Sequence, residues 1–452
     1  MPINSTHPQY DAKIDSITQT TNAYEGEVKQ YIPKLTGQTQ QQYDAYRSRA
    51  SFYNVVDRTA SALVGALMRK PYMLEGVVND EPICVDGADF TELVQTCYLE
   101  LLIGGRVGIM CDYSEEWDSP YILTYRSEDI TNWGDNFVVL RESYYSQDPQ
   151  DQYNTVQRMR YRELYLDEAG YYTVNIWEQQ PGMNGKFTLT RNTNFKLAET
   201  VQPMYRGQRL EFIPFVFCTP VDTSKEVYKP VLNNLAEINL EHYKVAVDIA
   251  YGAHFLALPT PYISGQLVND QQTVKIGGDE FIQLHQGGQV GFLEFQGAGM
   301  SFLLELQRQK EAQMFSLGSR LLQYKAGVES SEALQMRLGA EGASLITLTN
   351  SLEEALSEVL EMYNLWYGNT SEVELELNRD YSPMKLSPDD IRILLETYNK
   401  GVITLDTLMQ RLYEGEIVDD VDTELQGLGE PSVTPQLDQQ DDTNVDMGTS
   451  TE

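Results

Sequence analysis

The sequence predicts an α+β protein in which long helices flank a region of antiparallel strands. Residues 8–70, 226–252 and 301–368 carry apolar side chains at intervals of three and four, the period of one helix face. Between residues 106 and 220, short aromatic and β-branched runs alternate with Gly, Asn, Asp and Pro, which is typical of strands joined by turns. The chain has 452 residues, 41% of them hydrophobic, which is enough for two or three units with buried cores.

The N-terminal half is predicted to begin with helices and to continue with strands. Residues 8–70 are expected to be helical until Lys70-Pro71 stops the pattern. One helix face is formed by Tyr46, Ala50, Tyr53, Val56, Ala60, Leu63 and Leu67. A shorter helix over 90–103 should end at Gly104-Gly105, and "RVGIMCDY" should follow as a buried strand. Runs such as "NFVVLRESYY" and "EFIPFVFCT" then predict antiparallel β-structure.

The C-terminal half is predicted to be mainly helical. A helix over 226–252, with Pro230 in its first turn, should carry a stripe made of Leu235, Ile238, His242, Val245 and Ile249. A small β insert follows, in which Gly287-Gly288 indicates a hairpin because both positions tolerate positive φ. Two long helices, 301–323 and one from "SSEAL" to Gly368, come next.

A strand and a helix pair complete the predicted elements. The segment "SEVELELNRDY" predicts the strand, and in the helix pair after it Gly401 should end the first helix and Thr404 should cap the second. No Lys or Arg follows Arg411, and from residue 427 the composition is that of a disordered acidic tail.

Motifs for catalysis are scarce in this sequence. The four cysteines are scattered, and none of the four histidines has metal-ligand spacing, so we expect neither a metal site nor a cofactor. Neither G-x-x-x-x-G-K-[ST] nor G-x-S-x-G occurs, and "GGRVG" precedes its strand instead of following one. His242 is expected to be an interior histidine. These observations argue against an enzyme, although a pair of carboxylates could always lie close among 67 acidic residues.

Charge and hydropathy set further expectations. With 33 basic and 67 acidic residues the net charge is −34, the opposite of a protein that grips nucleic acid through its phosphates. Such acidity often means only solubility, but it also suits a surface that must sit near a polyanion without binding it. No run approaches the roughly 20 apolar residues that span a bilayer, and no signal peptide is evident. We therefore expect a soluble, cytosolic protein without a membrane role.

Four stretches, in order, resemble phage portal proteins, the head-to-tail connectors of tailed phages. The stretches are "YIPKLTGQTQQQYDAYRSRASFYNVVDRTASALVGALMRKP", "LLIGGRVGIMCDY" with "SPYILTYRSEDITNWG" and "FVVLRESY", "PVLNNLAEINLEHYKVAVDIAYGAHFLALPTPYISG", and "ESSEALQMRLGAEGASLITLTNSLEEALSEVLEMYNLWYG". The chain is similar to the portal-like family formerly labelled a domain of unknown function. Its strong acidity departs from the usual family pattern, which leaves open which surfaces meet DNA.

The resemblance implies a portal fold with a mixed α/β wing, a two-helix stem, a small β-containing clip, a long wing helix and a helical crown. The implied parts are the wing (1–220), a stem helix (221–252), the clip (253–300), a stem helix (301–323), the tunnel loop (324–332), the wing again (333–385), the crown (386–425) and a disordered acidic tail (426–452). Portals are rings, typically dodecamers, at a capsid vertex, and double-stranded DNA passes through them during packaging and ejection.

The resemblance also implies partners and site residues. The clip is expected to dock the terminase and later the head-to-tail adaptor, through Asp279, Glu280, Gly287 and Gly288. The wing is expected to meet the major capsid protein. The stem's channel face would comprise Glu305, Arg308, Gln309, Gln313 and Arg320, and the tunnel loop, which would contact DNA, Tyr324, Lys325, Ala326, Gly327, Val328 and Glu329. The protein would lie in the virion, and in the host cytoplasm during assembly.

An acidic channel suits the passage of DNA. Repulsion over about a Debye length, roughly 8 Å at physiological salt, would keep the duplex centred without binding it. Two alternatives stay open at this point: another capsid-associated structural or scaffolding protein, and a hydrolase that uses two carboxylates.

Overall fold

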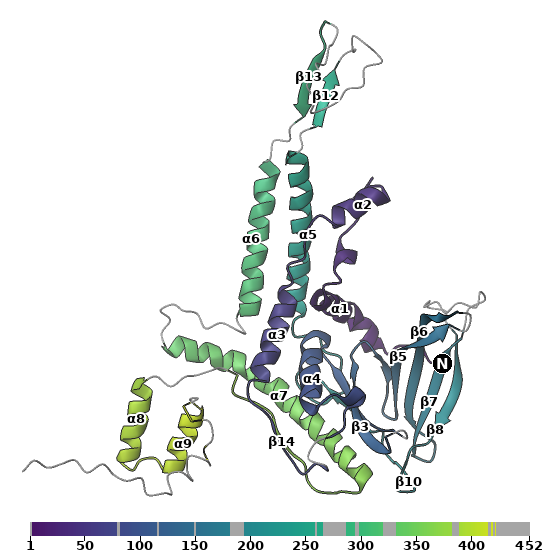
Figure 1. Cartoon of the computed structure of the whole chain (residues 1–452), viewed down its shortest axis with the longest axis vertical. Coiled ribbons are helices and arrows are strands. Elements are labelled where there is room, and N and C mark those ends of the chain that lie inside the picture. Colours follow the sequence, from purple (N-terminus) through teal and green to yellow (C-terminus); the bar gives the residue numbers. More distant parts are fainter. Residues whose placement is uncertain are drawn as a thin grey trace, which may run out of the picture. The chain divides into compact units, whose positions relative to one another are not determined.

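Helices and sheets occur together in the computed structural model of the chain, which confirms the α+β class (Figure 1). The structure describes every residue except 1, 79–81, 115–116, 149–150, 181–193, 258–259, 265–285, 294–297, 320–330, 382–387, 415–416, 419–420 and 422–452. The chain divides into two compact units, Met1–Tyr381 and Ser382–Glu452.

The N-terminal helical region consists of three helices, α1 (Pro8–Glu25), α2 (Gln40–Arg47) and α3 (Val55–Leu67), with a 3-10 turn at Lys29–Tyr31. The expectation of one helix face running from Tyr46 to Leu67 was wrong. Asn54 begins α3 by accepting a 3.0 Å hydrogen bond from the Asp57 N–H, which separates α3 from α2. Tyr53, in that break, is 55% exposed, whereas Leu63 and Leu67 are buried as predicted.

The predicted strands form two antiparallel sheets. The three-stranded sheet has the order β11-β2-β3 and the five-stranded sheet the order β4-β5-β6-β7-β8. Their strands are β2 (Val107–Ser114), β3 (Ser119–Arg126), β4 (Ile130–Trp133), β5 (Phe137–Asp148), β6 (Asp151–Leu166), β7 (Tyr172–Gln179), β8 (Phe195–Val201) and β11 (Phe215–Cys218). A short ribbon pairs β9 (Met204–Tyr205) with β10 (Gln208–Arg209). The antiparallel β-structure predicted between residues 106 and 220 is therefore confirmed.

Helix α4 (Phe90–Gly104) ends as predicted, with Gly105 in the left-handed conformation at φ 69°. A distant segment of the chain, residues 228–232, lies against this end. The Leu232 N–H donates a 3.1 Å hydrogen bond to the Leu102 carbonyl, which would otherwise be one of the unsatisfied acceptors of the last helical turn. The end of α4 is thus joined to the segment that leads into the next long helix.

The larger of two hydrophobic clusters lies around the second half of α7 (Ser331–Tyr367). Leu352, Leu356, Val359 and Tyr363 of α7 are fully buried against α3, α4, β2 and β11. Beyond α7 the chain returns to pair β14 (Glu374–Glu376) with β1 (Met73–Glu75). The smaller cluster packs α1 between strands of both sheets. Long-range packing of this kind is what stabilises long helices, more than their intrinsic propensity.

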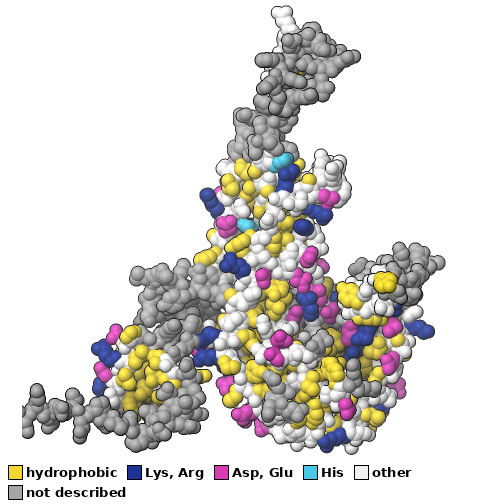
Figure 2. Space-filling view, viewed as in Figure 1, with side chains coloured by type: hydrophobic (Ala, Val, Ile, Leu, Met, Phe, Trp, Pro, Cys, Tyr) yellow, Lys and Arg dark blue, Asp and Glu magenta, His cyan; other side chains and the backbone are white. Residues whose placement is uncertain are grey.

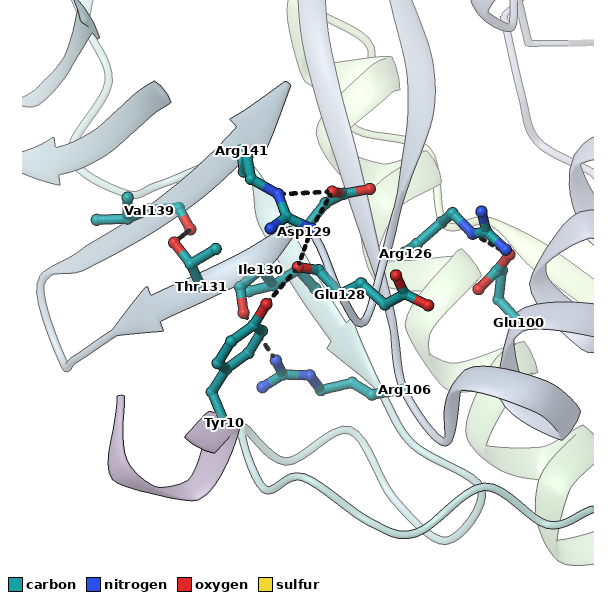
Figure 3. A network of polar contacts seen from close by, with 10 residues as sticks. All are labelled: Tyr10, Glu100, Arg106, Arg126, Glu128, Asp129, Ile130, Thr131, Val139 and Arg141. Atoms are coloured by element: carbon teal, nitrogen blue, oxygen red, sulfur yellow. Dashed lines mark hydrogen bonds and ion pairs between the residues drawn. The ribbon is translucent and has the colours of Figure 1, made fainter. Parts of the chain in front are cut away.

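A partly buried polar network joins α1 to the segment that leads into strand β4 (Figure 3). The Tyr10 hydroxyl donates to the Glu128 carbonyl at 2.9 Å, and Arg141 donates to the same carbonyl and to the Asp129 carboxylate. Arg106 is fully buried, donates to the Ile130 carbonyl at 3.2 Å and lies 4.1 Å from the centre of the Trp133 ring. Burial lowers the pKa of this guanidinium to about 9. Carbonyl and ring contacts offset part of the cost of burying this cation.

Glu100 of α4 should make stability depend on pH. Burial raises its pKa to about 7, against the effect of Arg126, whose Nε donates to its carboxylate at 3.0 Å. The pKa of Glu100 is higher in the folded chain than in the unfolded chain, so protonation of Glu100 stabilises the fold. This stabilisation is complete below about pH 4.5 and is lost as pH rises through 7. Glu100→Gln should therefore raise the free energy of unfolding by about 2–3 kcal/mol at pH 8, and by little at pH 4.5.

Urea denaturation at the two pH values measures this effect. Glu92→Gln, at an exposed site on the same helix, removes the same charge and should show no gain that grows with pH. Equal effects of Glu100→Gln at both pH values would contradict the assignment.

The second unit contains the predicted helix pair, α8 (Pro388–Asn399) and α9 (Leu405–Glu414). Gly401 has φ 71°, and the Thr404 hydroxyl accepts from the Thr407 N–H at 3.3 Å, so both predicted ends are confirmed. The predicted tail, residues 426–452, lies outside the described residues.

Candidate functional site

The candidate site is a pair of long helices, α5 (Asn233–Ala257) and α6 (Ala298–Ser319), which pack side by side (Figure 1). Both were predicted, but α5 begins at Asn233 and not at residue 226. Its start is delayed because Leu232 donates its N–H to α4, so Pro230 precedes the helix. Helix α6 was expected over 301–323, and residues 320–323 lie outside the described part.

The facing sides of α5 and α6 are apolar, with polar contacts between them. Leu235 and Val245 of the predicted stripe are buried, and Met314 of α6 is 2% exposed. Lys310 pairs with Glu241. His242 is buried as expected, with Nε2 at 3.3 Å from Gln307 Nε2 and 3.5 Å from Glu311 Oε1. No group of three or more His, Cys, Asp or Glu among the described residues could hold a metal ion. His242 is therefore an interior histidine of the helix pair.

Helix α5 is fixed to the N-terminal region by buried side chains. The Asn239 amide, fully buried, accepts from the Val55 N–H at 3.0 Å and donates to the Tyr53 carbonyl at 2.9 Å. Further along α5, the Tyr46 hydroxyl of α2 hydrogen-bonds the Asp248 carboxylate. Asn239 thus provides hydrogen-bond partners for the Val55 N–H and the Tyr53 carbonyl, in the break between α2 and α3. Without partners, these two backbone groups would be costly to bury. No pattern in the residues around Asn239 indicates this role.

The outward side of α6 is partly polar and partly apolar. The predicted channel-face residues Glu305, Arg308, Gln309 and Gln313 are all exposed there. Phe302, Leu304 and Phe315 are also exposed, by 69%, 42% and 51%. Figure 2 shows apolar side chains among charged ones along this helix pair. Sequence reasoning followed the buried stripe and missed these residues, although their positions off that stripe could have indicated them.

Beyond the helix pair, β12 (Thr260–Ser264) and β13 (Gln289–Leu293) form an antiparallel ribbon. Gly287, at φ 95°, lies in a turn directly before β13, and Gly288 follows it. The strand predicted on the other side of Gly287-Gly288 lies outside the described residues, as do Asp279 and Glu280.

The remaining predicted site residues are not part of the described structure. Arg320 and the whole set from Tyr324 to Glu329, including Lys325, Ala326, Gly327 and Val328, lie outside it. Their assigned roles therefore stay predictions. No helix in the described part of the chain is both long and apolar enough to cross a bilayer.

Comparisons with known proteins place a family match on the helix pair and on α7. Residues 231–367 match the family described as a domain of unknown function, DUF4055. No curated protein matches the chain.

Several solved structures are distantly similar. A chain from the virion of a native gene transfer agent particle has 12% identity and a TM-score of 0.41, over 88% of this chain and 99% of that one. A chain from the neck of a native gene transfer agent particle with C12 symmetry has 12% identity and a TM-score of 0.38, over 79% and 89%. An HK97 family phage portal protein from Corynebacterium diphtheriae has 10% identity and a TM-score of 0.33, over 71% and 91%.

Proposed function

We propose that the chain is a phage portal protein, one subunit of a ring at a capsid vertex through which double-stranded DNA is packaged and ejected. The observation that carries the proposal is one exposed face of α6, where Leu304 and Phe315, eleven residues apart and so on the same side of the helix, are exposed by 42% and 51%. Large apolar side chains exposed on one face of a helix indicate a protein partner. The order of elements, helix, β insert, helix and long helix, agrees with the parts that the resemblance implies.

A ring explains why one helix exposes both apolar and polar residues. Ring closure requires a heterologous contact, repeated from each subunit to the next, so each subunit buries two different faces. Leu304 and Phe315 would lie in that contact. The polar positions Glu305, Arg308, Gln309 and Gln313 would face the water-filled channel, as in an amphipathic helix with one wet side.

The charge of that polar side suits a sliding duplex. It carries one acid, Glu305, and one base, Arg308, which lie 3.9 Å apart, together with two glutamines. A surface without a basic stripe makes no array of phosphate contacts, so it does not trap DNA. The loop between α6 and α7, with Lys325 and Gly327, is proposed as the tunnel loop, where a lone cation would meet the DNA backbone.

The other parts are assigned by the same proposal. The clip, which includes the β12–β13 ribbon, would dock the terminase and then the head-to-tail adaptor. The wing would contact the major capsid protein, and the α8–α9 pair would form the crown. The portal would act without a cofactor and without catalysis of its own, in the virion and, during assembly, in the host cytoplasm.

Electron microscopy and native mass spectrometry of the purified full-length chain test the proposal. We expect rings with a central hole and one dominant stoichiometry, typically twelve subunits. A capsid-associated scaffolding protein would give other particles, without an open ring. A chain that stays monomeric at micromolar concentration would contradict the proposed function.

A further inference from the structure

A basic segment lies near the N-terminus of this strongly acidic chain. Residues 29–49 contain four basic residues, Lys29, Lys34, Arg47 and Arg49, and a single acidic one, Asp44, in a chain whose net charge is −34. Arg47 pairs with Asp44 at 2.9 Å, so the net positive charge of the segment comes from the other three basic residues. Lys29, Lys34 and Arg49 are exposed. We call residues 29–53 the basic shoulder.

The basic shoulder is held on α5 and not on α6. The Tyr46 hydroxyl binds Asp248 of α5, and the Tyr243 hydroxyl of α5 donates to the Arg47 carbonyl at 3.4 Å. In Figure 1, α2 and α6 lie on opposite sides of α5. The shoulder also exposes two large apolar side chains, Leu35 by 42% and Tyr53 by 55%. One side of the helix pair therefore combines cations with exposed apolar residues.

The α6 side of the helix pair has complementary features. Glu241, Glu305 and Glu311 are more than half exposed, at 52%, 60% and 54% of their side-chain surface. Arg308, near these glutamates, is an exposed base. Lys310, which pairs with Glu241, is only 20% exposed. The exposed apolar residues Leu304 and Phe315 lie on the same helix. This side offers carboxylates next to apolar surface.

We infer that the basic shoulder of one subunit docks against the α6 side of the next copy of the same chain. The inference rests on the proposed ring, and it names the two faces that the heterologous contact joins. Leu35 and Tyr53 would cover Leu304 and Phe315. Lys34 and Arg49 would meet Glu241 and Glu311. Opposite charges around an apolar centre fix the register of such a contact and disfavour wrong partners.

The basic shoulder and the α6 side lie on opposite sides of the helix pair (Figure 1), as a head-to-tail contact between subunits requires. A surface that meets its own copy in a two-fold dimer must be self-complementary, whereas two different surfaces on opposite sides join subunits head to tail. The basic shoulder would repel another basic shoulder and attract the α6 side. Attraction between such exposed groups weakens as salt shortens the Debye length, from about 10 Å at 0.1 M to about 3 Å at 1 M.

Charge reversal on each side, alone and combined, tests the inference in the full-length chain. Lys34→Glu/Arg49→Glu should weaken ring assembly at least about tenfold in native mass spectrometry, and so should Glu241→Lys/Glu311→Lys. The chain with all four substitutions should recover rings, because the attraction is restored with opposite signs. Lys196→Glu/Arg392→Glu reverses two exposed bases outside the shoulder and should leave assembly unchanged.

The outcomes separate this inference from the proposed function. Rings that form equally well from the unmodified chain and the Lys34→Glu/Arg49→Glu chain would overturn the docking and leave the portal proposal standing. Failure of the four substitutions together to restore rings would also overturn it. If the unmodified chain forms no ring, both proposals fail. Rings of the unmodified chain should also dissociate when salt is raised from 0.1 to 1 M. Rings that do not respond to salt would contradict the charge pairing.

Discussion

Replacing Phe315 with glutamate should convert assembled rings into single subunits. The ring of Phe315 is half exposed in the isolated chain, so its burial would occur on assembly. A buried aromatic residue at the centre of an interface typically contributes about 2–4 kcal/mol, and a carboxylate in its place would also lack a partner there. The loss recurs at every contact around the ring, so a modest change per interface has a large effect on the whole assembly.

Native mass spectrometry and size-exclusion chromatography with light scattering would measure this loss. Helix content and the unfolding midpoint of the Phe315→Glu subunit should stay close to those of the unmodified subunit, because Phe315 contributes little to its core. Tyr145→Glu is a suitable control, since Tyr145 is a 73% exposed aromatic residue on β5, away from α6. Rings of Phe315→Glu as stable as those of Tyr145→Glu would contradict the role of α6.

Replacing Gly105 with alanine should lower the free energy of unfolding by about 2–5 kcal/mol. Gly105 has a left-handed backbone, which alone costs an alanine about 1 kcal/mol. An alanine Cβ would also lie 2.6 Å from the Tyr228 carbonyl oxygen and 2.9 Å from Pro230 N, which are backbone atoms. They cannot move without displacing the segment that leads into α5, so the strain of overpacking adds to the backbone cost.

Gly170→Ala is the matched control for this substitution. Gly170 also has a positive φ, 85°, but a Cβ there would meet no atom within 4 Å. It should therefore lower stability by only about 1 kcal/mol. Urea denaturation followed by circular dichroism gives both values. Equal effects of the two substitutions would show that the contact between the end of α4 and residues 228–230 has no energetic importance.

Several features of the fold could be predicted from local sequence alone. The end of α4 at Gly104-Gly105, the pair of caps at Gly401 and Thr404, and the run of strands from β2 to β11 all depend on neighbouring residues and their backbone preferences. The stripe of α5, with Leu235, His242 and Val245 buried, follows from the helical period. These predictions succeeded because each one uses interactions within a few residues of the chain.

Other features could not be predicted because distant segments decide them. The apolar period continues from Tyr46 to Leu67, yet the chain breaks before α3, where the Asn239 amide from α5 binds the backbone of Tyr53 and Val55. The start of α5 depends on a hydrogen bond from Leu232 to α4, more than a hundred residues earlier in the chain. Neither contact leaves a pattern in the sequence around it.

The sequence by itself determined the class of the fold, the positions of most helices and strands, the acidity of the chain and the scarcity of catalytic motifs. Only the tertiary structure decided which apolar residues stay exposed and on which side. Phe302 and Phe315 look like ordinary helix residues in the sequence, and only the packing of α5 against the opposite face of α6 leaves them on the surface. Burial depends on contacts between segments far apart in the chain. The residues next to Phe302 and Phe315 in the sequence therefore do not reveal it.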